Sequence, residues 1–140
     1  MLPQLIGAWA LMAACVVLHA IAVVTALRTL GLESNHPKNF WQMTLLLVRL
    51  AGWMVMFHLL EVALWAGYYT LTSALPDIYT ALYFSAVTYT TTGYGDVVLE
   101  RPWRLVGGIE ALTGILMCGW TTGFFFAAMS RGYERMKGRT

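Results

Sequence analysis

Three long apolar stretches separated by polar connectors dominate the chain. They run from about Leu5 to Leu27, from about Phe40 to Tyr69, and from about Arg104 to Ser130. Roughly 20 consecutive apolar residues in a helix cross the hydrocarbon core of a bilayer, and each stretch is at least that long. The first stretch is too long for the apolar part of a signal peptide and no positive charge precedes it. The pattern therefore predicts three transmembrane helices.

A fourth apolar piece lies between the second and third stretches and is too short to span. Pro76 and Asp77 favour a helix start, with proline in the first turn and an acid near the positive end of the helix dipole. The following residues, DIYTALYFSAVTYT, amount to about 15, or roughly 22 Å at the rise of an α-helix. We expect this helix to enter the membrane from one side and to end inside it.

Composition agrees with a membrane protein. The 140 residues are 59% hydrophobic and 11% charged, against about 25% charge in soluble domains, and the mean hydropathy is +0.63. The sequence has no basic run with interleaved aromatics that would indicate binding to nucleic acid. Cys15 and Cys118 fall in different apolar stretches, where a thiol is more often packed than bridged. The chain is thus predicted to be an all-α, multi-pass protein of the cell membrane in contact with lipid.

The positions of the basic residues predict the topology. Arg28 and Lys38 flank the first connector, and four basic residues follow the third stretch, whereas the connector between the second and third stretches has only Arg101 and Arg104. Loops with an excess of lysine and arginine stay in the cytoplasm. The first connector and the C-terminus are therefore predicted to be cytoplasmic, and the N-terminus and the segment from Thr70 to Trp103 to lie outside.

The short helix leads into a polar segment, TTTGYGD, from Thr90 to Asp96. Irregular backbone at membrane depth is tolerated only where it is buried in protein or lines water, because lipid cannot satisfy its N–H and C=O groups. Glycines at alternate positions permit unusual dihedral angles, which allow successive carbonyls to turn toward one axis. Carbonyl oxygens suit hard, redox-inert cations. The segment is therefore a candidate cation-binding backbone.

TTTGYGD, placed after a short helix and between two spanning stretches, resembles the selectivity filter of potassium channels. The resemblance extends from about Phe40 to Thr140. It implies a pore module over residues 34–140, with an outer helix 40–69, a pore helix and filter 76–96 and an inner helix 104–130. Residues 1–33 are then an additional N-terminal transmembrane helix. It also implies a homotetramer and passive K⁺ conduction without a cofactor. The filter residues would be Thr91, Thr92, Gly93, Tyr94 and Gly95, with K⁺ held by the first four carbonyls and the Thr91 hydroxyl.

The same resemblance predicts which residues support the filter. Thr92 stands where valine is commonest in the family, and Tyr83-Phe84 replaces the common pair of tryptophans. Tyr83 can still donate a hydrogen bond to Asp96, whereas Phe84 has no donor for the hydroxyl of Tyr94. Thr88 is the expected partner for Tyr94. A looser brace behind the filter follows as a hypothesis.

The third stretch resembles the inner helix that lines the pore in this family. Gly114 stands at the usual hinge position. Residues at helical spacing share one face of a helix, and this predicts a pore lining drawn from Ile115, Cys118, Thr122 and Phe126. Trp120, in the middle of the stretch, is expected either to pack against a neighbouring helix or to narrow the cavity.

Placing a charged residue within a membrane span costs free energy, and such residues are therefore candidates for a functional role. Glu61 and Glu110 fall near the depth of the pore helix. Two roles are open for them: a structural role, either bonded to pore-helix hydroxyls or protonated, and a role in gating or pH sensing. His58 and Glu61 also have the i, i+3 spacing of a metal-binding pair, to which His19 could add a ligand. A metal-dependent membrane enzyme is thus a remote alternative.

The sequence as a whole predicts a K⁺-selective ion channel and not an enzyme. No ladder of arginines at every third position occurs, so a voltage-sensing domain is not expected. A channel of the same architecture that also passes Na⁺ remains the nearest alternative.

Overall fold

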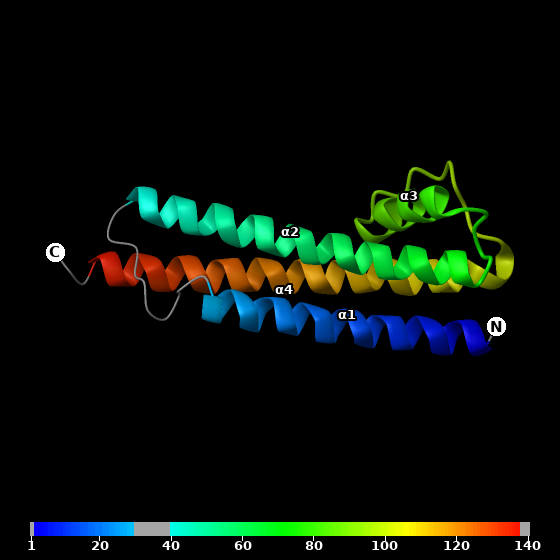
Figure 1. Ribbon diagram of the computed structural model, residues 1–140, viewed down its shortest axis with the longest axis horizontal. Coiled ribbons are helices and arrows are strands. Elements are labelled where there is room, and N and C mark those ends of the chain that lie inside the picture. Colours follow the sequence, from blue (N-terminus) through cyan, green and yellow to red (C-terminus); the bar gives the residue numbers. More distant parts are fainter. Residues whose placement is uncertain (1, 30–39, 138–140) are drawn as a thin grey trace.

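Three long helices lie side by side along the molecule (Figure 1). The computed structural model describes residues 2–29 and 40–137, and within them the regular structure is entirely helical. The long helices are α1 (Leu2–Thr29), α2 (Phe40–Leu71) and α4 (Arg104–Lys137). Each is long and apolar enough to cross a membrane. The prediction of an all-α membrane protein with three spanning helices is confirmed.

A short helix, α3 (Ile78–Tyr89), packs against α2 and α4 at one end of the bundle (Figure 1). Asp77 caps it, since the Asp77 carboxylate accepts hydrogen bonds from the Thr80 backbone N–H at 2.9 Å and from the Thr80 hydroxyl at 2.7 Å. Side-chain caps of this kind satisfy one of the free N–H groups in the first turn. The helix therefore begins after Asp77, and the prediction that Pro76 lies in the first turn is wrong. A 3₁₀ turn, η1 (Arg101–Trp103), leads from the polar segment into α4.

Small residues on one face of α1 bring it against α2 and α4. Ala8, Cys15, Ala22 and Ala26 are fully buried, and His19 lies on the same face and is equally buried. Without a hydrophobic driving force in lipid, helices associate through small residues that let their backbones approach closely. Next to this face, the Trp53 indole N–H donates to the Ala22 carbonyl at 3.0 Å. The buried small residues and this hydrogen bond indicate that α1 packs closely against the other helices.

The end of α4 differs from the sequence-based expectation. The sequence predicts an inner helix that ends near Ser130, but α4 continues to Lys137. The added residues include arginine, glutamate, methionine and lysine, which are good helix formers, and no proline interrupts them. Arg131, Arg135 and Lys137 therefore extend the third helix.

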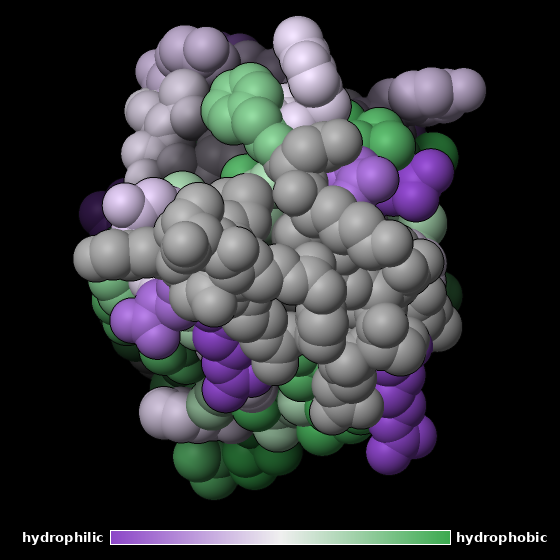
Figure 2. Space-filling view, turned by 90° about the vertical axis from the view of Figure 1, so that its left-hand side faces the viewer, coloured by the Kyte–Doolittle hydropathy of each residue, from purple (hydrophilic) through white to green (hydrophobic). Residues whose placement is uncertain are grey.

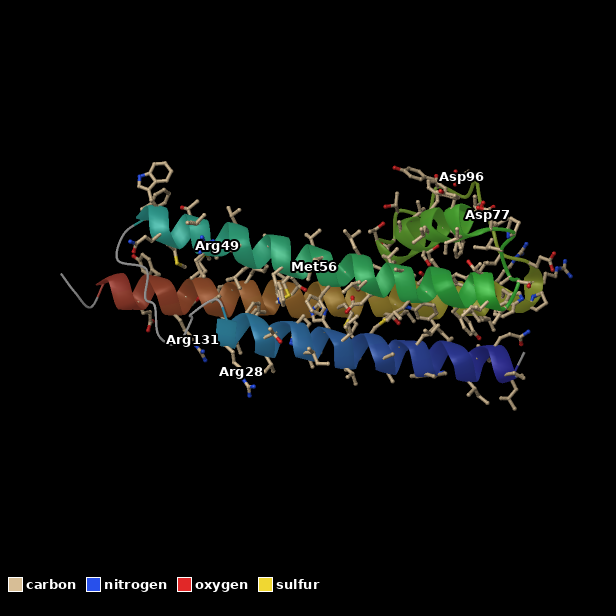
Figure 3. All side chains as sticks on the ribbon, viewed as in Figure 1. Arg28, Arg49, Met56, Asp77, Asp96 and Arg131 are labelled. Carbon is tan, nitrogen blue, oxygen red and sulfur yellow. The ribbon has the colours of Figure 1, made fainter. Side chains whose placement is uncertain are left out.

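Charged side chains gather at the two ends of the bundle. Figure 3 shows Arg28, Arg49 and Arg131 toward the end where α1 ends and α2 begins, and Asp77 and Asp96 at the opposite end beside α3. In the end-on view of Figure 2, hydrophilic side chains stand beside hydrophobic ones at the arginine-bearing end. The N-terminal end of α1 lies at the same end as α3 (Figure 1). This is the relative arrangement that the predicted topology requires.

Candidate functional site

The polar segment Thr90–Asp96 begins where α3 ends, and its first amides turn back to that helix. The backbone N–H of Thr91 donates to the Thr88 carbonyl at 2.9 Å. The N–H groups of Thr92 and Gly93 both donate to the Val87 carbonyl, at 2.9 and 3.2 Å. The carbonyls of Val87 and Thr88, near the C-terminal end of α3, are thus satisfied by the segment that follows.

These bonds determine the direction of the carbonyls. In a planar trans peptide the C=O of one residue and the N–H of the next point in opposite directions. Because the N–H groups of Thr92 and Gly93 point toward α3, the carbonyls of Thr91 and Thr92 point away from it. Among the described residues, no backbone carbonyl from Thr91 to Gly95 accepts a hydrogen bond, and these five residues are exposed. The segment therefore presents free backbone oxygens on its outer side.

Left-handed residues alternate along the segment. The φ angles are +59° at Thr91, +55° at Gly93 and +79° at Gly95, and the residues between them do not have positive φ. Glycine adopts this region without steric cost, but for β-branched Thr91 it costs on the order of 1 to 3 kcal/mol. Such strain persists only where the surrounding structure holds it, and at Thr91 the bonds to α3 do so.

Hydroxyls hold the base of the segment. The Thr90 hydroxyl donates to the Ala86 carbonyl at 2.7 Å and lies 2.9 Å from the Thr92 hydroxyl. Since the proton of Thr90 is directed to Ala86, Thr92 donates the second bond. The Thr92 side chain is therefore turned back toward α3, on the side opposite to its carbonyl.

The far end of the segment is tied to α3 by a tyrosine. The Tyr83 hydroxyl donates to Asp96 Oδ2 at 2.6 Å, which is the bond expected from the sequence. This bond lowers the pKa of Asp96 and raises the pKa of Tyr83, because it favours the ionised carboxylate and the neutral phenol. The bond predicted between Thr88 and Tyr94 is absent within the described chain, and Tyr94 is 72% exposed. The Tyr94 side chain is thus largely open in a single chain.

Below the segment, five polar side chains from four helices form a closed ring. His19 Nδ1 lies 3.1 Å from Glu61 Oε1. The Tyr89 hydroxyl donates to Glu61 Oε2 and lies 3.0 Å from His58 Nδ1. Thr121 Oγ1 completes the ring at 3.0 Å from His58 Nε2 and 3.0 Å from His19 Nε2. This ring, His19–Glu61–Tyr89–His58–Thr121, connects α1, α2, α3 and α4.

The ring is sheltered and adjoins the polar segment. His19 and Glu61 are fully buried, and the His58 side chain is 19% exposed. The Trp120 ring packs on the His19 ring with centroids 5.4 Å apart, so Trp120 packs against α1. Tyr89 is the last residue of α3 and directly precedes Thr90. Sequence reasoning singled out Glu61 and the two histidines but missed Tyr89 and Thr121, because a lone tyrosine or threonine in an apolar run carries no distinguishing signal.

Glu110 occupies a second buried polar site behind α3. The Tyr69 hydroxyl of α2 donates to Glu110 Oε2 at 2.8 Å, and both residues are fully buried. Tyr69 of α2, which sequence reasoning did not name, is therefore a hydrogen-bond partner of Glu110. Ser85 of α3 is buried near this carboxyl, but its hydroxyl has no hydrogen-bond partner in the described structure. Glu110 thus joins α4 to α2.

The predicted pore-lining residues share an unpacked face of α4. Ile115 is 57% exposed and Phe126 is 68% exposed, and Cys118 and Thr122 are exposed between them. Gly114, the predicted hinge, instead has a neighbour within the chain, because a Cβ at this position would overlap the Tyr89 carbonyl. The structure therefore gives Gly114 a packing role, and its role as a hinge stays a prediction.

Comparison with known protein families identifies the family of the chain. A family described as "Ion channel" matches residues 43–131, which is more than half of the sequence. The chain belongs to this ion channel family. The matched residues of the channel include most of α2, all of α3 and most of α4, and they begin after α1. No curated protein and no solved structure was found to be similar to the channel.

Proposed function

We propose that the channel conducts K⁺ passively and selectively through a ring of four Thr90–Asp96 segments. The observation that carries this proposal is the direction of the backbone oxygens: the amides of Thr92 and Gly93 bond to α3, and the carbonyls of Thr91 and Thr92 point away unpaired. In K⁺ channels, carbonyls of a T-V-G-Y-G loop replace the hydration shell of the ion. The TTTGYGD sequence and the alternating left-handed residues support the same function here.

The chain supplies one such segment, so four copies are needed to surround an ion. Unpaired carbonyls facing lipid would be costly, and a cyclic tetramer turns them toward a shared axis. The C-terminal end of α3 points its partial negative charge toward Thr90. Four such ends would attract a cation to the base of the ring. A homotetramer in the cell membrane is therefore the proposed assembly.

Charge supports one orientation of the proposed tetramer. Arg28, Arg49 and Arg131 lie toward the end of the bundle away from α3 (Figure 3). By the positive-inside rule this end faces the cytoplasm. The N-terminus and the Thr90–Asp96 segment then face outward, and the C-terminus is cytoplasmic.

A second candidate is a monovalent cation channel of the same architecture that also passes Na⁺. It is favoured by one observation, namely that Tyr94 is 72% exposed and has no hydrogen bond to Thr88 within the described residues. If the four Thr90–Asp96 segments are held loosely, they would discriminate less between K⁺ and Na⁺ by ion size. Selectivity must therefore be measured directly.

Reversal potentials in K⁺ and Na⁺ gradients distinguish the two candidates. The purified channel is reconstituted in liposomes, and the potential is measured with K⁺ on one side and Na⁺ on the other, with barium as blocker. A K⁺-selective channel gives a potential that follows the K⁺ gradient. A potential near zero supports the non-selective candidate. Absence of K⁺ flux from an assembled tetramer contradicts both.

A pair of glycine variants tests whether the backbone of the segment carries the flux. Gly93→Ala places a side chain at φ +55°, where it is strained. Gly52→Ala is the matched control, because an added Cβ there meets nothing within 4 Å. We expect Gly93→Ala to abolish K⁺ flux and Gly52→Ala to keep it. Equal flux from both variants, in tetramers of equal yield, would show that ions take another path.

A further inference from the structure

We propose that His19, His58 and Glu61 form a binding site for a zinc-class divalent cation, which fastens α1 to the base of the Thr90–Asp96 segment. One ligand atom of each residue lies within 4.8 Å of the others. The Nδ1 atoms of His19 and His58 lie 3.1 and 3.3 Å from the two oxygens of Glu61. Ligands of tetrahedral zinc, at 2.0 to 2.2 Å from the metal, are separated by roughly 3.3 to 3.5 Å. Two of the three ligand pairs are therefore already spaced close to zinc ligands.

Counting protons shows why a cation suits the ring. Its five contacts need one proton each. With Glu61 ionised and both histidines neutral, two imidazoles, one phenol and one threonine hydroxyl supply only four. The ring is then one proton short and carries a buried negative charge. A divalent cation between the Nδ1 atoms and the carboxylate takes the place of the missing proton and neutralises the carboxylate, which leaves the site with a net charge of +1.

The outer contacts of the ring match the shell that surrounds bound metals. When Nδ1 of each histidine binds the cation, both Nε2–H groups can donate to Thr121 Oγ1, which lies 3.0 Å from each and has two lone pairs. Partners of this kind hold metal-binding histidines in the correct tautomer. The Tyr89 hydroxyl holds the second oxygen of Glu61. Thr121 and Tyr89 are thus positioning residues of the site.

The position of the site gives it a structural consequence. His19 is the contribution of α1, which lies outside the residues that match the ion channel family. Tyr89 is the last residue of α3 and directly precedes Thr90. A bound cation would therefore connect the added helix to the residue from which the polar segment starts.

Zinc binding to the whole channel tests the site. The protein is purified in detergent with a chelator, freed of it, and titrated with Zn²⁺ while bound metal is measured per chain. We expect one tightly bound Zn²⁺ per chain, and at least tenfold weaker binding in His19→Ala and in Glu61→Gln. His36→Ala removes the third histidine of the sequence and is the matched control, which should bind as the unmodified chain does. No bound Zn²⁺, or binding that only His36→Ala removes, would overturn the proposal and leave the ring bridged by a proton alone.

Two further variants keep the test decisive if the ligand variants do not assemble. Thr121→Val and Tyr89→Phe retain all three ligands, and loss of outer partners typically weakens metal binding 10- to 100-fold. Co²⁺ serves as a spectroscopic probe, because four-coordinate Co²⁺ absorbs visible light strongly. We expect a strong Co²⁺ spectrum that both variants weaken. Unchanged Zn²⁺ affinity in both variants would rule out Thr121 and Tyr89 as positioning residues of the site.

A stability measurement addresses the fastening of α1. A ligand that binds only the folded state raises the unfolding temperature as its concentration rises. We expect Zn²⁺ to raise it for the unmodified channel and for His36→Ala but not for Glu61→Gln. Equal shifts in all three would contradict the site. Because these readouts do not involve ion flux, a failure of the conduction proposal leaves them unaffected.

Discussion

Three successive threonines have three different roles at the end of α3. Thr90 closes the helix with a hydroxyl bond to Ala86, Thr91 takes a left-handed conformation, and Thr92 bonds its hydroxyl to Thr90. None of these roles consumes the carbonyls of Thr91 and Thr92, which remain free for a ligand. The Thr92 hydroxyl therefore makes a hydrogen bond while the Thr92 carbonyl stays free.

The Tyr83–Asp96 bond makes a pH prediction at the scale of single residues. The bond lowers the pKa of Asp96, so its contribution is complete above the ordinary aspartate pKa of about 3.9 and is lost as pH falls through the lower folded value. Removing the donor in Tyr83→Phe should raise the pKa of Asp96 toward about 3.9. Carboxyl titration of Asp96 by NMR measures this change.

Tyr79→Phe is the control for this titration, because Tyr79 is 82% exposed and lies on the same helix. We expect it to leave the pKa of Asp96 unchanged. If Asp96 titrated at the same pH in Tyr83→Phe and in the unmodified channel, the bond would not persist in solution.

At the scale of elements, α3 and α4 meet backbone to backbone at Gly114. A Cβ at this position would overlap the Tyr89 carbonyl, whereas at Gly123 on the same helix it would meet nothing within 4 Å. A glycine at such a crossing is required for space. Flexibility of α4 at Gly114 is a separate property, and the two can be distinguished.

Gly114→Ala should destabilise the channel. Overpacking at a close contact typically costs about 1 to 3 kcal/mol, and here the clash is with backbone. Gly123→Ala should be neutral or stabilising by up to about 1 kcal/mol, the difference in helix propensity. Thermal unfolding of both purified variants measures these effects. A Gly114→Ala channel that unfolds at the normal temperature but conducts abnormally would favour the hinge over the packing role.

The elements themselves were largely predictable, and their partners were not. Long apolar runs predicted α1, α2 and α4 because span length depends only on local composition. The end of α4 was missed because a polar sequence can continue a helix beyond the membrane. Tyr89 and Thr121 were missed because their partners lie 28 to 102 positions away along the chain, and such contacts leave no mark in a local pattern. The charged and histidine residues were found because they are rare in spans.

At the scale of the whole molecule, one chain leaves its most distinctive surfaces open. Tyr94 is 72% exposed, and the face of α4 that bears Ile115 and Phe126 is more than half exposed. Exposed apolar residues are expected at the lipid surface of a membrane protein, so it is the row of unpaired carbonyls that favours assembly, because lipid cannot satisfy them. The proposed tetramer would cover part of these surfaces and enclose the rest around its axis.

Cys118 provides a direct test of which part is enclosed around the axis. It is exposed on α4, whereas Cys15 is fully buried on α1. In a Cys15→Ser background, a charged thiol reagent applied from the side of the C-terminus should modify Cys118 and reduce K⁺ flux, because it places bulk and charge in the ion path. A Cys118→Ser channel, treated in the same way, should keep its flux and serves as the control. Mass spectrometry measures the extent of modification. If Cys118 were fully modified without any fall in flux, this face of α4 would lie outside the ion path, and the predicted lining by Ile115, Cys118, Thr122 and Phe126 would have to be abandoned even if the tetramer itself were confirmed.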